Sequence, residues 1–198
     1  MGSFITRNYM CRSGTGIAAA VVMGTGMQPV VILKLSKAIL RIQKVFWGSH
    51  HVSRLMDKLA FGSYNKRVGN VRTPFDWLSR DAERVDRYIS DSMCGFVFTV
   101  NGFNALFELI ARLYRRESLK QIPGNLPVYM VSGTDDPVGD YGKGVQKAYD
   151  SLKEAGLENM ELKLYEGGRH ELMNETNRAE VMQDIYEWLK RVVLRQQG

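Results

Sequence analysis

The sequence has few cysteines and no long run of apolar residues. Its 198 residues include 2 cysteines, Cys11 and Cys94, which lie far apart without partners at metal-ligand spacing, so we expect neither a disulfide framework nor a zinc site. The longest apolar stretches, residues 17–23 and 29–33, are too short for a membrane-spanning helix, which needs about 20 residues. No basic segment followed by an apolar stretch and a cleavage site opens the chain. We therefore predict a cytoplasmic protein.

Acidic residues are in the minority, with 21 Asp and Glu against 27 Lys and Arg and a net charge of +6. Aromatic residues do not interleave with the basic clusters, which argues against a nucleic-acid partner. We interpret the clusters as solvated helix faces or as faces that attract an anionic lipid surface or substrate. They comprise Lys34, Lys37, Arg41 and Lys44 on one helical stretch, and Arg112, Arg115, Arg116 and Lys120 on another.

Strand and helix patterns alternate at both ends of the chain, which predicts the α/β class. Residues 17–23 form a continuous apolar run, typical of a parallel strand that is buried on both faces. Strand patterns return at residues 128–132 and 162–165. Amphipathic helical patterns follow them at residues 142–155 and 178–194.

Residues 27–121 are helical in pattern, apart from a weak strand signal at residues 96–98, and we predict a helical cap or lid there. The remaining core then consists of residues 1–26 and 122–198. One helix of the cap is amphipathic and basic, with apolar residues at helical spacing: Val31, Leu35, Ile39, Ile42 and Phe46. A second apolar stripe is expected to pack in the core: Phe103, Leu106, Phe107, Ile110 and Leu113.

Asp136 and His170 each follow a strand-like run, at the place where open α/β sheets present ligand-binding side chains. An acid there can accept the Nδ1 proton of the histidine and stabilise the imidazolium that forms when the ring takes a proton from a nucleophile. Gly167 and Gly168 leave room for a tight turn that brings His170 back over the sheet. The alternative is that this turn has no further role and that the acidic residues cap the next helix.

The segments around these two residues resemble one family. Residues 133–139 (GTDDPVG), 165–171 (YEGGRHE) and 184–189 (DIYEWL) are similar to the last third of α/β-hydrolases of the monoacylglycerol lipase and lysophospholipase type, the serine aminopeptidase-type group. Residues 75–81 (FDWLSRD) and 92–96 (SMCGF) resemble the helical cap of bacterial members. The resemblance runs through the whole chain and implies a partial α/β-hydrolase fold with a helical cap.

In this family the nucleophile is a serine in a Gly-x-Ser-x-Gly elbow that precedes the acid and the histidine. The chain opens with Met1-Gly2-Ser3, which resembles the residues immediately after that serine, so the elbow serine and the earlier strands are expected to be missing. Met1 and Gly2 are then the predicted anion-binding group, because a cationic amine at a helix start attracts anions. Ser3 is the closest substitute nucleophile, ahead of Ser13 and Ser132.

We therefore expect a carboxylic ester hydrolase of the serine type that acts on a lipid-like or small apolar ester, with His170 as general base. The alternative is a truncated, catalytically impaired hydrolase that serves as a binding or interaction protein. Loss of a neighbouring strand beside residues 17–23 predicts a homodimer or a complementing N-terminal fragment at that edge. We expect no cofactor and no metal, since the adjacent His50 and His51 are poor candidates for a metal pair.

Overall fold

The fold is built on a small parallel sheet, seen in a computed structural model that describes residues 1–196. The strands are β1 (Ala20–Met23), β2 (Val128–Gly133) and β3 (Met160–Tyr165), in the spatial order β1-β2-β3. Both pairings are parallel, with Ala20 opposite Val128 and Val128 opposite Met160. The parallel arrangement with long helical crossovers confirms the predicted α/β class.

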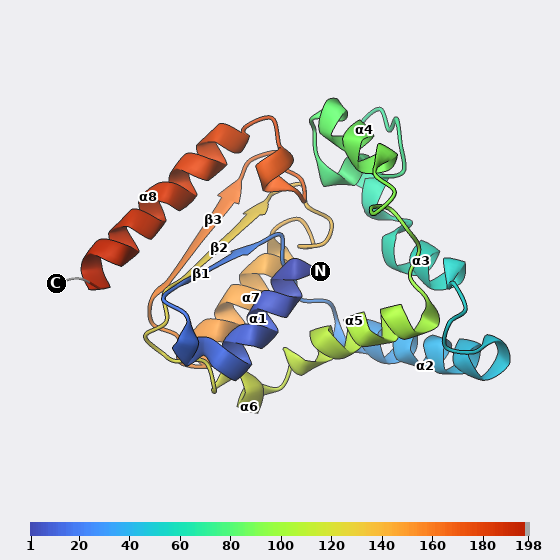
Figure 1. Cartoon of the computed structure of the whole chain (residues 1–198), viewed down its shortest axis with the longest axis horizontal. Helices are drawn as coiled ribbons and strands as arrows, with labels where there is room; N and C mark the ends of the chain where they lie inside the picture. Colours follow the sequence, from blue (N-terminus) through green and yellow to red (C-terminus); the bar gives the residue numbers. More distant parts are fainter. Residues whose placement is uncertain (197–198) are drawn as a thin grey trace.

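Helices cover both faces of this sheet (Figure 1). α1 and α7 lie on one face and α8 on the other. The α-helices are α1 (Gly2–Ser13), α2 (Val30–Trp47), α3 (Arg54–Phe61), α4 (Ala82–Ser90), α5 (Val100–Arg112), α6 (Arg116–Leu119), α7 (Lys143–Glu154) and α8 (Arg178–Gln196). Short 3-10 turns are η1 (Gly14–Gly16), η2 (Tyr64–Arg67), η3 (Asp76–Leu78) and η4 (Leu172–Asn174).

β2 is the central strand and is buried along its whole length. Val128 and Met130 belong to the apolar cluster on the α1 and α7 side, whereas Tyr129 and Val131 belong to the cluster on the α8 side. The Tyr129 ring stacks on Trp188 of α8, with ring centroids 5.4 Å apart. This alternation is what a strand between two helical layers requires, because successive side chains point to opposite faces.

β1 corrects the predicted strand over residues 17–23, since pairing begins only at Ala20. β2 starts at Val128, directly opposite Ala20, so the described β1–β2 ladder does not extend to residues 17–19. Val21 and Met23 are only partly buried, against the α8 cluster, so β1 is not covered fully on both faces. The length of β1 is therefore set by its partner, although the apolar run begins earlier.

The predicted core stripe on α5 is confirmed. Phe103, Phe107 and Ile110 of α5 are buried, as is Leu113 just beyond the end of the helix. The weak strand signal over residues 96–98 was wrong, because the segment makes no ladder and a single bridge pairs its neighbour Thr99 with another part of the chain.

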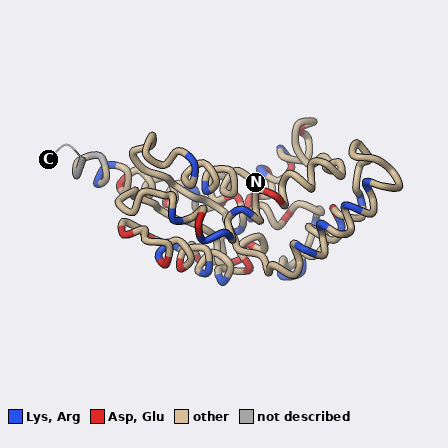
Figure 2. Tube along the Cα trace, turned by 90° about the horizontal axis from the view of Figure 1, so that it is seen from below, with Lys and Arg blue, Asp and Glu red and all other residues tan. Residues whose placement is uncertain are grey.

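The α2 helix packs on α5 through one side and leaves its opposite side uncovered. Leu33 and Leu40 are buried, and Ile39 of the predicted apolar stripe packs partly against the core. The rest of that stripe faces solvent, with Val31 75% and Phe46 73% exposed. Lys and Arg recur along the extended arm of the molecule that carries α2 (Figure 2). Within the described part of the chain, no helix has the length and apolarity needed to cross a membrane.

Candidate active site

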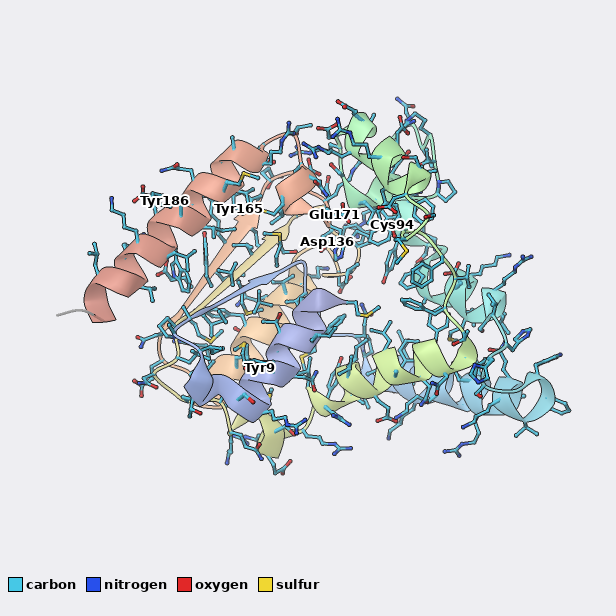
Figure 3. All side chains as sticks on the ribbon, in the orientation of Figure 1. Tyr9, Cys94, Asp136, Tyr165, Glu171 and Tyr186 are labelled. Carbon is cyan, nitrogen blue, oxygen red and sulfur yellow. The ribbon has the colours of Figure 1, made fainter. Side chains whose placement is uncertain are left out.

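Asp136 and His170 meet at the carboxyl ends of β2 and β3. His170 Nδ1 lies 3.0 Å from Asp136 Oδ2. Asp136 is fully buried, and the His170 side chain keeps 18% of its exposure. Asp136 lies beyond the strand ends, between the sheet and the helices that connect β1 to β2 (Figure 3). A carboxylate can only accept hydrogen bonds, so Nδ1 carries the proton and Nε2 is left as the basic nitrogen.

The carboxylate of Asp136 is oriented by its own strand and turn. The Val138 N–H donates to Oδ1 at 2.8 Å, and the Ser132 hydroxyl donates to Oδ2 at 3.3 Å. α7 begins after Gly142 without a side-chain cap, so Asp136 does not cap that helix. Ser132 is fully buried, and because its hydroxyl donates to Asp136 it serves here to orient the acid.

The imidazole of His170 is held between a backbone turn and an aromatic ring. Gly24 has φ +57°, and a Cβ there would lie 3.0 Å from His170 Cε1, so a side chain at this position would collide with the ring. On another side the Trp77 ring lies 5.3 Å from the imidazole, centroid to centroid. Sequence reasoning missed Gly24 and Trp77, although Trp77 belongs to the compact aromatic segment of residues 75–81.

α1 is hydrogen-bonded to the turn of residues 24–26, which packs against the imidazole of His170. The Ser3 hydroxyl donates to the Gly24 carbonyl at 3.2 Å. One helical turn later, Arg7 Nη1 donates to Thr25 Oγ1 at 3.3 Å and to the Gly26 carbonyl at 3.2 Å. Ser3 is almost fully buried, and no hydrogen bond joins its hydroxyl to the imidazole among the described residues. The structure therefore shows Ser3 as a support of this turn, and its predicted role as nucleophile stays untested.

The amino end of α1 lies in the field of the same acid. Burial lowers the pKa of the Met1 amino group, while the charge of Asp136 opposes that shift. The first turn of α1 has no side-chain cap, so its N–H groups are not occupied by a side chain. Met1 and Gly2 thus stand at the start of a helix near the acid, and their role in anion binding stays a prediction. Ser13 ends the same helix at its far end.

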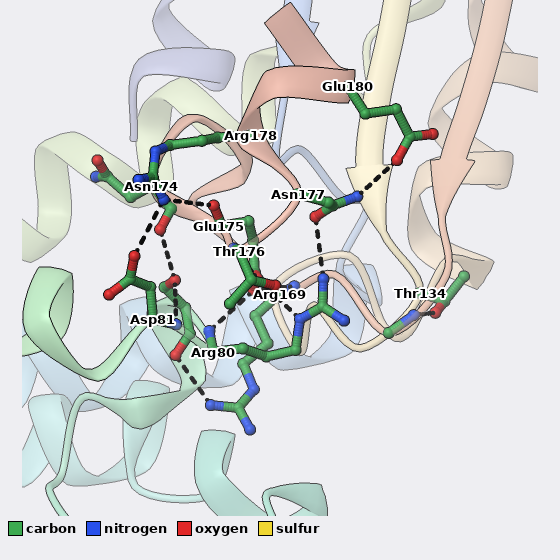
Figure 4. A network of polar contacts seen from close by, with 12 residues as sticks. Arg80, Asp81, Thr134, Arg169, Asn174, Glu175, Thr176, Asn177, Arg178 and Glu180 are labelled. Atoms are coloured by element: carbon green, nitrogen blue, oxygen red, sulfur yellow. Dashed lines mark hydrogen bonds and ion pairs between the residues drawn. The ribbon is translucent and has the colours of Figure 1, made fainter.

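The buried carboxylate of Glu175 joins two segments (Figure 4). One is the histidine loop, residues 166–175, and the other is part of the helical connection, residues 24–127 between β1 and β2. Glu175 is fully buried, and its Oε2 accepts from Arg80 Nε at 2.8 Å. The backbone N–H groups of Arg80, Arg169 and Thr176 each donate to it at 3.0 Å. Glu175 therefore joins the residue before His170 to the segment that carries Trp77.

Further contacts bind the two segments together. The Arg169 guanidinium donates to the carbonyl oxygens of Asp76 at 2.7 Å and of Ser79 at 3.0 Å. An ion pair joins Arg178 to Asp81 at 3.1 Å. Residues 76–81 are thus attached directly to the loop that bears His170, and the Trp77 ring is held against the imidazole by contacts made on both sides of it.

Aromatic residues continue the wall beyond Trp77. The Tyr64 ring meets Trp77 edge to face at 4.9 Å, and burial, followed by the nearby Asp136 and Tyr141, raises the pKa of Tyr64. Arg67 lies over the Tyr141 ring, 3.7 Å from its centroid. The site therefore combines one buried acid–histidine pair with an apolar aromatic wall. In the described part of the chain, no cluster of His, Cys, Asp and Glu is suited to hold a metal ion.

The family model described as "Serine aminopeptidase, S33" matches residues 1–177. Among curated protein sequences, none matches this chain.

Solved structures with a similar fold include esterases and lipases. A thermostable carboxyl esterase from Bacillus coagulans, in complex with glycerol, is 24% identical, with a TM-score of 0.87 over 96% of this chain. A lipase in its open form is 26% identical, with a TM-score of 0.83 over 96% of this chain. A monoglyceride lipase from Saccharomyces cerevisiae, in complex with a substrate analogue, is 22% identical, with a TM-score of 0.66 over 96% of this chain. The chain spans 62% of the length of each of these structures.

Proposed function

Since this chain belongs to the serine aminopeptidase S33 family of α/β-hydrolases, as its sequence resemblance predicted, we propose that it carries the acid and base of a carboxylic ester hydrolase. The observation that carries the proposal is the 3.0 Å contact between His170 Nδ1 and the buried Asp136 carboxylate, which leaves Nε2 free to move a proton. The likeness to esterases and lipases supports an ester as substrate, and the aromatic wall of Trp77 and Tyr64 favours a lipid-like or small apolar one.

In the proposed reaction, His170 Nε2 removes the proton of a serine hydroxyl as its oxygen bonds to the ester carbonyl carbon. The carbonyl oxygen becomes an oxyanion, which the free N–H groups at the start of α1 stabilise. The intermediate collapses to an acyl-enzyme, and His170 gives its proton to the departing alcohol. Water then bonds to the acyl carbon while His170 Nε2 takes its proton; the bond to the serine oxygen breaks, His170 returns the proton to that oxygen, and the acid is released. Asp136 stabilises the imidazolium in both halves.

The source of the serine is a separate part of the proposal. The chain spans 62% of the similar structures, so a complementing N-terminal segment that carries the elbow serine is one source. Ser3 is the other, and it must first break its hydrogen bond to the Gly24 carbonyl. A route without any serine is direct activation of water by His170, and this route is slower because no covalent intermediate forms.

That same hydrogen bond of Ser3 favours a second candidate, a binding or interaction protein without turnover. β1 is an edge strand of the described sheet, and exposed Ile5 and Tyr9 of α1 add an apolar surface at this end of the chain. A second copy of the chain or the complementing segment is the partner expected at this edge. A core of residues 1–26 and 122–198, a cap of residues 27–121 and a cytoplasmic location remain parts of the proposal.

Ester turnover and active-site labelling test these functions on the chain of 198 residues. Hydrolysis of p-nitrophenyl butyrate should be abolished by His170→Ala and kept by His50→Ala, an exposed histidine that serves as control. Asp136→Asn should lower it by about 10⁴-fold. Fluorophosphonate labelling that Ser3→Ala removes would identify Ser3 as nucleophile, and turnover without labelling would indicate water activation. If neither ester turnover nor labelling is detected, catalysis by this chain is refuted and the binding function is left.

A further inference from the structure

The solvent side of α2 is apolar, which is unusual for a helix that is already packed on another side. α2 buries Leu33 and Leu40 against the helical connection. Roughly 120–220° further round the helix lies a row of exposed apolar residues. This row, which we call the outer stripe, consists of Val31, Leu35, Ile42, Val45 and Phe46, all more than half exposed. Two separate apolar sides indicate two separate apolar environments.

The flank of the outer stripe carries charge of one sign. α2 contains four basic residues and no Asp or Glu. Lys34, Lys37, Arg41 and Lys44 lie between the outer stripe and the buried side, at roughly 20–100° from Leu33. Lys37 pairs with Glu108 of α5 at 2.5 Å. Among the described residues, the other three form no ion pair, so their charge is available to an anionic partner.

An anionic bilayer surface satisfies both halves of this face. Acyl chains take up an apolar stripe, and lipid phosphates neutralise the cations beside it. At 18 residues α2 is about 27 Å long, and it does not qualify as a membrane-spanning helix. The combination is typical of a helix that lies in the plane of the interface.

A second copy of the chain suits the face less well. Two α2 helices that meet by their outer stripes in a twofold arrangement bring the two basic flanks near one another. Within the described part of the chain, Lys34, Arg41 and Lys44 of each flank have no acidic partners, so like charges repel across such an interface. An anionic surface turns the same charges into an attraction.

We propose that α2 is a membrane-surface helix, which inserts the outer stripe among the acyl chains of an anionic bilayer while Lys34, Arg41 and Lys44 bind the headgroups. This role concerns binding alone and holds whether or not the chain turns over an ester. With ester hydrolysis, it brings the acid–histidine pair to a surface where lipid-like substrates are concentrated.

Co-sedimentation with vesicles tests the proposal on the full chain. Vesicles containing phosphatidylglycerol should retain the protein, and vesicles of phosphatidylcholine alone should retain far less. Val31→Asp with Phe46→Asp should weaken binding by at least about 100-fold, because two apolar side chains lose their burial. Lys34→Gln with Lys44→Gln should weaken it by roughly 25-fold, about fivefold for each charge. Tyr186→Asp and Lys190→Gln on α8 are matched exposed controls and should bind as the parent does.

Three outcomes would overturn the proposal. One is equal retention by the two kinds of vesicle, and another is unchanged binding by both paired variants. The third is a dimer in analytical ultracentrifugation that Val31→Asp with Phe46→Asp dissociates, without vesicle binding, since a second copy then covers the stripe. The altered side chains are solvent-exposed, so thermal melting should show each variant folded. If the variant with Val31→Asp and Phe46→Asp unfolds, the variant with Lys34→Gln and Lys44→Gln still tests the proposal.

Discussion

Glu175 is the residue whose replacement tests most directly how the histidine loop is held. Its Oε1 accepts the N–H groups of Arg80 and Arg169, and its Oε2 accepts Arg80 Nε and the Thr176 N–H. In Glu175→Gln one of these oxygens becomes an NH₂ group. Whichever way the amide is placed, two N–H donors then face another donor, and the ion pair with Arg80 is lost.

The cost of this change can be worked from those contacts. A buried donor left without an acceptor costs about 1–3 kcal/mol, and removal of one partner from a buried ion pair costs about 3–5 kcal/mol. Arg80 is one-third exposed, so water recovers part of its loss. We expect Glu175→Gln to lower the free energy of unfolding by about 3–4 kcal/mol. For a chain of this size that corresponds to a fall in Tm of roughly 6–16 °C.

Urea denaturation of the parent and the variant measures the difference directly. Glu166→Gln is the matched control, because Glu166 lies in the same loop and is exposed, and it should change stability by less than about 0.5 kcal/mol. The reasoning is refuted if Glu175→Gln loses less than about 1 kcal/mol, or no more than the control does. A loss of the predicted size combined with changed NMR chemical shifts of the His170 imidazole would show that the loop positions the base as well as stabilising the fold.

Three further changes probe the same region. Trp77→Ala should lower the free energy of unfolding by about 2 kcal/mol in a thermal melt and change the NMR chemical shifts of the His170 imidazole, because the Trp77 ring is partly buried against the imidazole. Burial lowers the pKa of Arg7 to about 10, a penalty of about 3 kcal/mol that its two hydrogen bonds offset at about 1.5 kcal/mol each. Arg7→Met should therefore leave the urea midpoint nearly unchanged, and a loss above about 3 kcal/mol would contradict this balance. Burial raises the pKa of Asp76, but hydrogen bonds from the Thr73 hydroxyl and from two backbone N–H groups lower it more, so the folded pKa lies below its usual 3.8. The Tm gap between the parent and Asp76→Asn should be full at pH 7, begin to shrink near pH 3.8 and close as pH falls through the folded pKa; a gap independent of pH would exclude the mechanism.

The acid and the histidine could be found from the sequence because their signals are local. Each follows a strand pattern within a few residues, and the Gly167-Gly168 turn marks the return of the chain toward the sheet. Trp77 and Gly24 carry no such signal, because each reaches the imidazole of His170 from a segment more than 90 residues away in the sequence. The start of β1 was missed for a related reason, since a strand ends where its neighbour ends, and the neighbour lies across the whole helical connection.

The two apolar stripes of the helical connection show the limit of periodicity more sharply. α5 and α2 both repeat apolar residues at helical spacing, yet α5 buries its stripe and α2 exposes its own. A period identifies a side of a helix without saying what covers it. On α2 the covered side includes Gln43, whose Oε1 accepts the Ser53 hydroxyl at 2.6 Å, so it is less purely apolar than the exposed side. A helix whose more apolar side faces solvent and whose charged residues share one sign is incomplete without a partner. If vesicles fail to bind that side, the same reasoning requires another surface to cover it.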